Sequence, residues 1–132
     1  MGALVLDSSV VIALFDTKDV HHEQAAAEVR RWRAAGGSFV LPATVVSEVL
    51  VGAHRQSTET VTHRRQQLRD TFGPIRVVDE DVAVTAARLR ASHGSLRLPD
   101  ALILAVAMVD GAERILTADK RWAAVDQRVT VI

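Results

Sequence analysis

The sequence contains no cysteine and no tyrosine, and only three phenylalanines and two tryptophans among its 132 residues. The absence of cysteine excludes disulfide bonds, thiolate metal sites and a cysteine nucleophile, and it is compatible with a reducing compartment. With so few aromatic rings, we do not expect a platform on which the bases of a nucleic acid stack. These absences exclude disulfide scaffolds and thiol enzymes.

An excess of charge of one sign and a long apolar run are also missing. Sixteen lysines and arginines balance sixteen aspartates and glutamates, so any contact with nucleic acid must come from a local site rather than from bulk charge. The longest apolar run, residues 101–109, has nine residues, whereas a membrane span needs about 20. No basic segment followed by an apolar run marks a secretion signal. We therefore expect a soluble, cytoplasmic protein that contacts no membrane.

Hydrophobic residues make up 48% of the sequence, which is enough for a core and, at this length, predicts a single domain over residues 1–132. Short apolar runs predict strands at residues 3–6, 39–41, 75–78, 114–116 and 129–132. Helical patterns predict helices at residues 9–15, 20–35, 44–54, 58–72, 79–92, 98–109 and 120–124. Strands that alternate with helices predict an α/β fold with a mostly parallel sheet covered on both faces.

In such sheets, ligands bind outside the carboxyl ends of the strands, near the point where the strand order reverses. Four acidic residues are therefore of interest because of where they lie. Asp7 directly follows the first predicted strand, and Asp119 comes shortly after the fourth. Asp100 opens a predicted helix behind a proline, and Glu48 lies at the margin of an apolar helical stripe. We expect these four carboxylates to converge at one edge of the sheet.

Taken singly, three of these acids have a simpler explanation. Asp7 and Asp119 can cap helices, and Asp100 can be a first-turn acid that the helix dipole favours. Taken together, carboxylates gathered in one cleft repel each other and become protonated unless a cation compensates them. An oxygen-only ligand set favours Mg²⁺, with Mn²⁺ as a substitute, over zinc. The cluster therefore predicts phosphate chemistry that depends on a divalent metal.

Several kinds of phosphate chemistry are excluded because their motifs are absent. No G-x-x-x-x-G-K-[ST] loop is present, so the chain is not a P-loop nucleotide hydrolase. No G-x-G-x-x-G follows the first predicted strand, which argues against a dinucleotide site. The Asp-x-Asp of dehalogenase-type phosphatases is replaced by Asp7-Ser8-Ser9. A metal-dependent nuclease is the interpretation that these absences favour.

Four motifs in order support that interpretation: Val5-Leu6-Asp7-Ser8-Ser9; Ser47-Glu48-Val49; Leu98-Pro99-Asp100-Ala101-Leu102-Ile103-Leu104-Ala105; and Leu116-Thr117-Ala118-Asp119-Lys120-Arg121-Trp122. Their order, spacing and total length resemble those of the PIN-domain family, and in particular of VapC-type toxins from type II toxin–antitoxin pairs. The resemblance extends over about residues 4–130. One departure is visible, since Trp122 stands where the family pattern more often has phenylalanine.

The resemblance implies a three-layer α/β/α sandwich and a Mg²⁺-dependent endoribonuclease that hydrolyses RNA by metal-activated water. It assigns Asp7, Glu48, Asp100 and Asp119 as the acidic catalytic and metal-binding residues, and Thr117 as the hydroxyl residue of the closing motif. Such toxins usually form homodimers and are neutralised by a small VapB-like antitoxin. We expect substrate contacts from residues beside these motifs: Ser8, Ser9, Thr117, Arg97, Lys120 and Arg121.

Two other functions remain open from the sequence. The chain could be a catalytically silent PIN-like module that only binds a protein partner, or a metal-dependent phosphatase that cleaves small phosphomonoesters. The apolar stretch at residues 101–109 has two explanations of its own. Such a helix is either buried on every side within the chain or shared with a second subunit.

Overall fold

The computed structural model describes all of residues 1–132, and its elements alternate as the apolar pattern predicts. They are, in order, β1 (Ala3–Leu6), α1 (Ser8–Phe15), α2 (His22–Ala34), β2 (Ser38–Pro42), α3 (Ala43–Gln56), α4 (Thr58–Phe72), β3 (Ile75–Arg76), α5 (Glu80–Ser92), α6 (Leu98–Asp110), β4 (Arg114–Thr117), the 3-10 helix η1 (Lys120–Ala124) and β5 (Val129–Val131). Most element bounds differ from the predicted ones by one or two residues.

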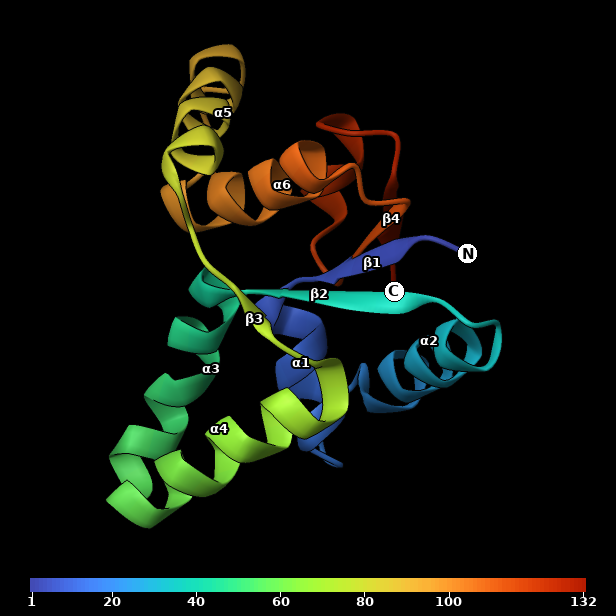
Figure 1. Cartoon of the computed structure of the whole chain (residues 1–132), viewed down its shortest axis with the longest axis vertical. Helices are drawn as coiled ribbons and strands as arrows, with labels where there is room; N and C mark the ends of the chain where they lie inside the picture. Colours follow the sequence, from blue (N-terminus) through green and yellow to red (C-terminus); the bar gives the residue numbers. More distant parts are fainter.

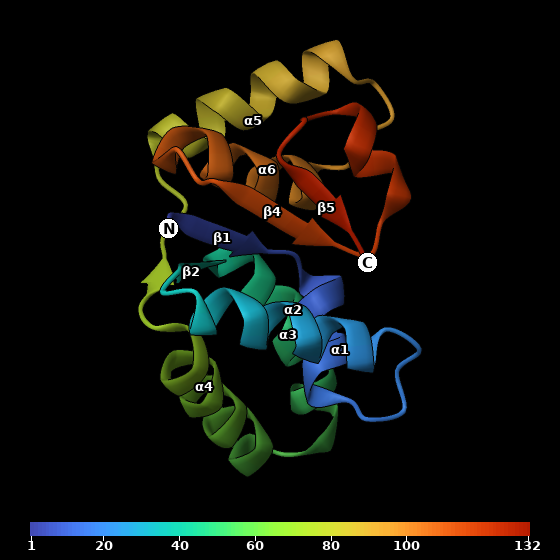
Figure 2. The same ribbon diagram turned by 90° about the vertical axis from the view of Figure 1, so that its right-hand side faces the viewer.

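All five strands are parallel and form one sheet in the order β3-β2-β1-β4-β5. The first strand is therefore central, and the chain adds β2 and β3 on one side of it before adding β4 and β5 on the other. The strand order reverses between β1 and β4, whose arrowheads point the same way in Figure 2. The carboxyl ends of these two strands are thus the place where a ligand is expected in an open parallel sheet.

The helices form a layer on each face of the sheet (Figure 1). One face is covered by α5 and α6, with α6 in contact with β1 and β4. The other face is covered by α1, α2, α3 and α4, among which α1 contacts β4, and α3 and α4 contact β2. The predicted α/β fold with a three-layer α/β/α sandwich is confirmed, and the sheet is entirely rather than mostly parallel.

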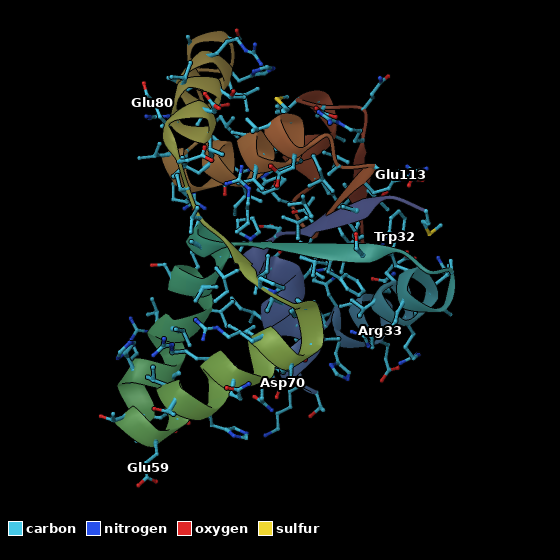
Figure 3. All side chains as sticks on the ribbon, in the orientation of Figure 1. Trp32, Arg33, Glu59, Asp70, Glu80 and Glu113 are labelled. Carbon is cyan, nitrogen blue, oxygen red and sulfur yellow. The ribbon has the colours of Figure 1, made fainter.

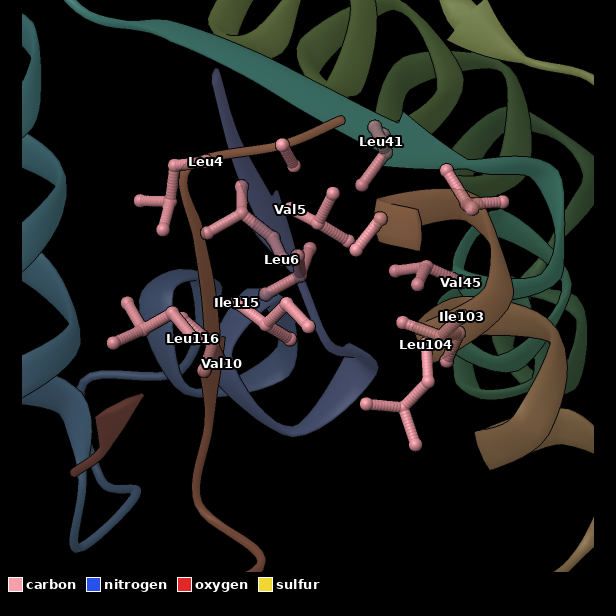
Figure 4. Packing of buried hydrophobic residues seen from close by; sticks show 14 of the residues in the cluster. Leu4, Val5, Leu6, Val10, Leu41, Val45, Ile103, Leu104, Ile115 and Leu116 are labelled. Carbon is pink, nitrogen blue, oxygen red and sulfur yellow. The ribbon is translucent and has the colours of Figure 1, made fainter. Parts of the chain in front are cut away.

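The hydrophobic core lies on both faces of the central strand (Figure 4). Consecutive residues of β1, Leu4, Val5 and Leu6, are all buried, although neighbouring side chains of a strand point to opposite faces. Figure 4 places Val10 of α1 and Ile103 of α6 around this strand. Burial on both faces explains why β1 is a continuous apolar run without polar alternation. It also fixes β1 as a rigid base for the residues that follow it.

The apolar helix α6 is buried within the chain itself. Its residues Ile103, Leu104, Ala105, Val106 and Ala107 are all inaccessible to solvent. The neighbouring helix α5 packs along α6 on the side away from the sheet (Figure 2). Burial within the chain therefore accounts for most of this apolar stretch, whereas Leu102 and Met108 are half-buried and Val109 is 38% exposed.

The third strand is shorter than predicted. Only Ile75 and Arg76 pair with β2, opposite Leu41 and Pro42, and α3 begins immediately after Pro42. Val77 has therefore no partner strand beside it, and it is 64% exposed rather than part of the sheet. The apolar run predicted a longer strand, but a strand extends only as far as its neighbour does.

Charged side chains occupy the periphery of the molecule. Glu59, Asp70 and Glu80, labelled in Figure 3, point outward from α4 and α5 and are exposed. Asp79 caps α5, since its carboxylate accepts a hydrogen bond from the backbone N–H of Val82. None of the helices combines the length and the hydrophobicity that crossing a lipid bilayer requires.

Candidate metal centre

The candidate site begins where β1 and β4 end side by side. Leu6 pairs with Leu116, and the next backbone N–H, that of Asp7, donates to the carbonyl of Leu116 at 3.0 Å. This register brings Asp7 level with Thr117, although 110 residues separate them in sequence. Thr117 Oγ1 donates to Asp7 Oδ2 at 2.7 Å, and the two residues are only 0% and 5% exposed. The Asp7 carboxylate is therefore oriented by a residue of the neighbouring strand β4.

Hydroxyl groups hold the Asp7 carboxylate in place. Ser9 Oγ donates to Oδ2 at 2.8 Å, and the backbone N–H of Ser8 donates to Oδ1 at 2.7 Å, so that Asp7 also caps α1. The hydroxyls of Ser9 and Thr117 in turn accept the backbone N–H groups of Ala118 and Asp119, each at 3.0 Å. Since each hydroxyl both donates and accepts, its proton must point at Asp7. The hydrogen bonds of these two hydroxyls therefore require an acceptor oxygen at the position of Asp7 Oδ2.

Glu48 reaches the same place from α3. Its Oε1 accepts a hydrogen bond from Ser8 Oγ at 3.0 Å, so Ser8 connects the Glu48 and Asp7 side chains. The apolar stripe predicted for this helix is buried or half-buried, and Glu48 is half-buried at its margin. Burial raises the pKa of Glu48, and the negative charges of Asp7 and Asp100 raise it further. The Glu48 carboxylate therefore lies close to those of Asp7 and Asp100, and its ionisation costs free energy in the folded protein.

Asp100 is contributed by the start of α6, where Pro99 occupies the first turn. Asp100 is 7% exposed, and burial raises the pKa of its carboxyl above the ordinary value. The negative charges of Asp7 and Asp119 act in the same direction, whereas Arg97, whose Nε lies 3.5 Å from Asp100 Oδ2, opposes them. A third carboxylate is thus placed beside the end of β1.

Asp119 follows β4 and precedes η1, where it caps the short helix. Its Oδ1 accepts hydrogen bonds from the backbone N–H and the Nε of Arg121, both at 3.0 Å, and its Oδ2 accepts from Nη2 at 2.6 Å. These bonds from Arg121 lower the pKa of Asp119. Unlike the other three acids, Asp119 is fully engaged by a cation of its own chain.

A cavity of about 120 Å³ opens beside the carboxylates of Asp100 and Asp119. Asp100 and Asp119 form part of its wall, together with the apolar side chains of Leu96 and Trp122. The indole N–H of Trp122 is buried and has no hydrogen-bond partner, so the exchange of phenylalanine for tryptophan at this position adds an unsatisfied donor. The complete lining consists of His93, Ser95, Leu96, Asp100, Asp119, Arg121, Trp122, Ala124 and Val125.

His93 and Ser95 were not among the residues expected from the sequence to form the site. They belong to the loop between α5 and α6, which leads directly into the helix that carries Asp100. A polar segment directly before that helix start is the signal that could have identified them. Conversely, Lys120 is exposed and forms no ion pair, although the sequence places it beside Asp119.

The chemistry of the donor set fits a hard divalent cation. Asp7, Glu48, Asp100 and Asp119 offer only carboxylate oxygens. Burial raises the pKa of Glu48 and Asp100, repulsion from the neighbouring carboxylates raises it further, and a bound cation would relieve that repulsion. As the side chains stand, no three of them are arranged to hold a metal ion together. Both oxygens of the Asp119 carboxylate also accept hydrogen bonds from Arg121.

Replacing Glu48 by glutamine is expected to stabilise the metal-free protein at neutral pH. Because burial raises the folded-state pKa above the ordinary value of 4.5, ionised Glu48 disfavours the folded state, whereas a glutamine side chain carries no charge and keeps an oxygen for Ser8. The penalty is complete above the folded pKa and absent below the unfolded one. Urea unfolding in EDTA should therefore show a gain at pH 7.5 that disappears as the pH falls below about 4. A less stable variant at pH 7.5 would contradict this account.

The fold and the site together define an α/β protein with an acidic cluster at the switch point of a parallel sheet. The family model for the PIN domain matches residues 4–128 of the chain. The chain therefore belongs to the PIN domain family, as the four motifs indicated. A search of curated proteins finds no match to this sequence.

Solved structures of toxins resemble this chain over nearly its whole length. The toxin–antitoxin complex from Klebsiella pneumoniae is 26% identical, covers 97% of this chain and 96% of that chain, and gives a TM-score of 0.75. VapBC-5 from Mycobacterium tuberculosis is 27% identical over 98% and 97% of the two chains, with a TM-score of 0.59. VapC20 from the same organism, a toxin that cleaves the sarcin–ricin loop, shares the fold at 19% identity, over 92% and 93% of the chains, with a TM-score of 0.71. The resemblance to VapC-type toxins is thus confirmed.

Proposed function

We propose that the chain is a Mg²⁺-dependent endoribonuclease and the toxin of a VapBC-type toxin–antitoxin pair. The observation that carries this proposal is the gathering of acidic side chains from the end of β1, from α3, from the start of α6 and from the β4–η1 turn at one edge of the sheet. These residues are Asp7, Glu48, Asp100 and Asp119. The likeness to the Klebsiella toxin–antitoxin complex supports it, because that likeness combines fold and sequence.

The four carboxylates would hold Mg²⁺, or Mn²⁺ in its place. When bound, the cation would lower the pKa of a water molecule and offset the negative charge of a phosphodiester. Within the chain, Ser8, Ser9 and Thr117 fix the Asp7 carboxylate, and Ser8 also holds Glu48. Such preorganisation matters because a carboxylate that must reorient during the reaction binds its partner less well.

Positive charge beside the acidic cluster would recognise the phosphate backbone of the RNA. Arg97, Lys120 and Arg121 are exposed and border the motifs, so their side chains can meet phosphate oxygens without burial. Because the net charge of the chain is zero, recognition would depend on these local groups rather than on the whole surface. RNA as the substrate is supported by the shared fold with VapC20, which cleaves the sarcin–ricin loop.

Two protein partners belong to this proposal. A small VapB-like antitoxin would neutralise the enzyme, since the Klebsiella relative and VapBC-5 are both members of toxin–antitoxin systems. A second copy of the chain would form a homodimer, as usual for toxins of this type. Because Ile103 to Ala107 of α6 are already covered within one chain, the dimer would use more exposed residues.

Cleavage of a labelled RNA pool tests the proposed activity. We expect cutting in Mg²⁺ that stops in EDTA and returns when Mg²⁺ is restored. A small aryl phosphomonoester, tested in parallel, should remain intact. Its hydrolysis with intact RNA would instead favour the metal-dependent phosphatase.

Thermal unfolding with and without Mn²⁺ separates a silent binding module from an enzyme whose RNA target is missing from the pool. A site that binds the cation should gain about 1.4 kcal/mol of stability at ten times Kd. No gain in stability together with no cleavage would support the silent module and contradict the proposal.

A further inference from the structure

Arg121 and a divalent cation compete for the same carboxylate. The proposed function, on which this inference rests, assigns Asp119 to the cation and Arg121 to the substrate. In the structure, however, these two side chains bind each other: Nε and Nη2 of Arg121 donate to Oδ1 and Oδ2 of Asp119 at 3.0 and 2.6 Å. Both roles can be fulfilled only if this pair separates. The question is whether it is built to separate.

A second pair in the same chain provides the comparison. Arg128 binds Asp126 through Nε and Nη2 at 3.0 and 2.8 Å, with the same spacing of two residues. Its Nη1 also donates to the carbonyls of Ala107 and Ala112, which ties the end of α6 to the start of β5. The Arg128 side chain is 28% exposed. That guanidinium is fixed by several partners.

Arg121 has none of these additional contacts. Its side chain is 73% exposed, and Asp119 is its only hydrogen-bond partner. An exposed ion pair of this kind contributes little to stability, because water solvates both charges when they separate. Asp100 lies near enough for its charge to act on Arg121, so the guanidinium partly neutralises the cluster as well. The pair therefore has the properties of an exchangeable one.

We propose that Arg121 is an exchangeable counterion of Asp119: its guanidinium holds the carboxylate when no divalent cation is bound and leaves it when one is. The carboxylate is thereby kept paired in the metal-free protein. The released guanidinium lies beside the cavity that Asp100 and Asp119 line, where an RNA phosphate can meet it. Occupation by Arg121 lowers the affinity for the cation, because the pair must break before the carboxylate is available.

Calorimetric measurement of Mn²⁺ affinity, without RNA, tests the exchange with two variants. Arg121→Gln removes both the charge and the guanidinium fork, whereas Arg121→Lys keeps the charge but cannot bind both oxygens in parallel. We expect both variants to bind Mn²⁺ roughly two- to fivefold more tightly than the wild type. Arg55→Gln, which removes an exposed charge at the end of α3, should leave the affinity unchanged.

The result for the lysine variant decides between exchange and simple repulsion. If Arg121→Lys binds Mn²⁺ like the wild type while Arg121→Gln binds it more tightly, only charge matters and the exchange is wrong. Equal affinities in all three proteins also overturn it, with the proposed cation centre intact. If no protein binds Mn²⁺, the cation centre of the proposed function fails first, and the exchange fails with it.

Side-chain NMR gives a second readout, independent of affinity. The Nε–H resonance of Arg121, identified by its absence in Arg121→Lys, should move toward the position of free arginine when Mg²⁺ is added. The Nε–H of Arg128, in its fixed pair, should stay in place. An Arg121 resonance that is unchanged at saturating Mg²⁺ would show that the pair persists and would overturn the proposal.

Discussion

Asp7→Asn should reduce Mg²⁺-dependent RNA cleavage by about a thousandfold or more. Asp7 follows the central strand β1, is 5% exposed, and interacts electrostatically with both Glu48 and Asp100. Asparagine removes its negative charge and one of its two acceptor oxygens. The measurement is the initial rate on a labelled RNA at saturating Mg²⁺, for wild type and variant purified in parallel.

The amide at position 7 also disturbs the hydroxyl network. The Oδ2 of Asp7 accepts from Ser9 and Thr117, and the oxygens of both hydroxyls already accept backbone N–H groups. An NH₂ group there would leave hydroxyl protons without an acceptor. Unfolding must therefore be measured beside activity, so that the rate is corrected for the folded fraction.

Asp70→Asn is the matched control for this prediction. It makes the same chemical change at an exposed residue of α4, whose carboxylate binds only Gln66 (Figure 3). We expect this variant to cleave RNA at the wild-type rate. Activity of the Asp7 variant within tenfold of the wild type, at equal folded fraction, would remove Asp7 from the catalytic site.

Thr117→Val should destabilise the protein by about 2 kcal/mol, because the buried hydroxyl makes two bonds that valine cannot replace. It donates to the Asp7 carboxylate at 2.7 Å and accepts the backbone N–H of Asp119 at 3.0 Å. The substitution keeps the volume of the side chain, so loss of packing contributes little. Thermal unfolding should show a decrease of roughly 7 °C for a chain of this length.

Thr117→Ser separates the hydroxyl from the methyl group. Serine keeps both hydrogen bonds and loses one buried methyl, so we expect a cost of about 1 kcal/mol or less. If the valine variant proves as stable as the serine variant, the hydroxyl does not hold the two strand ends together. The stability measurements need no metal and no substrate, and they are therefore independent of the proposed activity.

The sequence alone was sufficient to predict the alternation of strands and helices and the position of two acids at strand ends. Asp7 and Asp119 follow apolar runs that could be recognised as buried strands. The end of β3 could not be predicted, because it depends on where Pro42 terminates the neighbouring strand. Pairing partners in the sheet are distant in sequence, and an apolar run carries no information about the length of its neighbour.

Side-chain pairing within the site was not predictable either. The sequence indicates that Arg121 lies near Asp119, but whether the guanidinium faces the carboxylate or a substrate depends on its rotamer. The bridge through Ser8 to Glu48 requires α1 and α3 to pack side by side, which periodicity within either helix does not reveal. The hydroxyl of Thr117 became meaningful from the sequence only through the resemblance to a family.

The central position of β1 has a consequence for the order in which the site is assembled during synthesis. Of the five strands, the ribosome makes β1 first, yet β4, one of the two neighbours of β1 in the sheet, is made more than 100 residues later. Until β4 pairs with β1, Asp7 lacks its hydrogen bond from the Thr117 hydroxyl. Asp100 and Asp119, the acids from α6 and the β4–η1 turn, are also made near the end of the chain. A nascent chain therefore contains Asp7 and Glu48 well before it contains Asp100, Thr117 and Asp119, and the complete acidic cluster can form only after β4 has been made and has paired with β1.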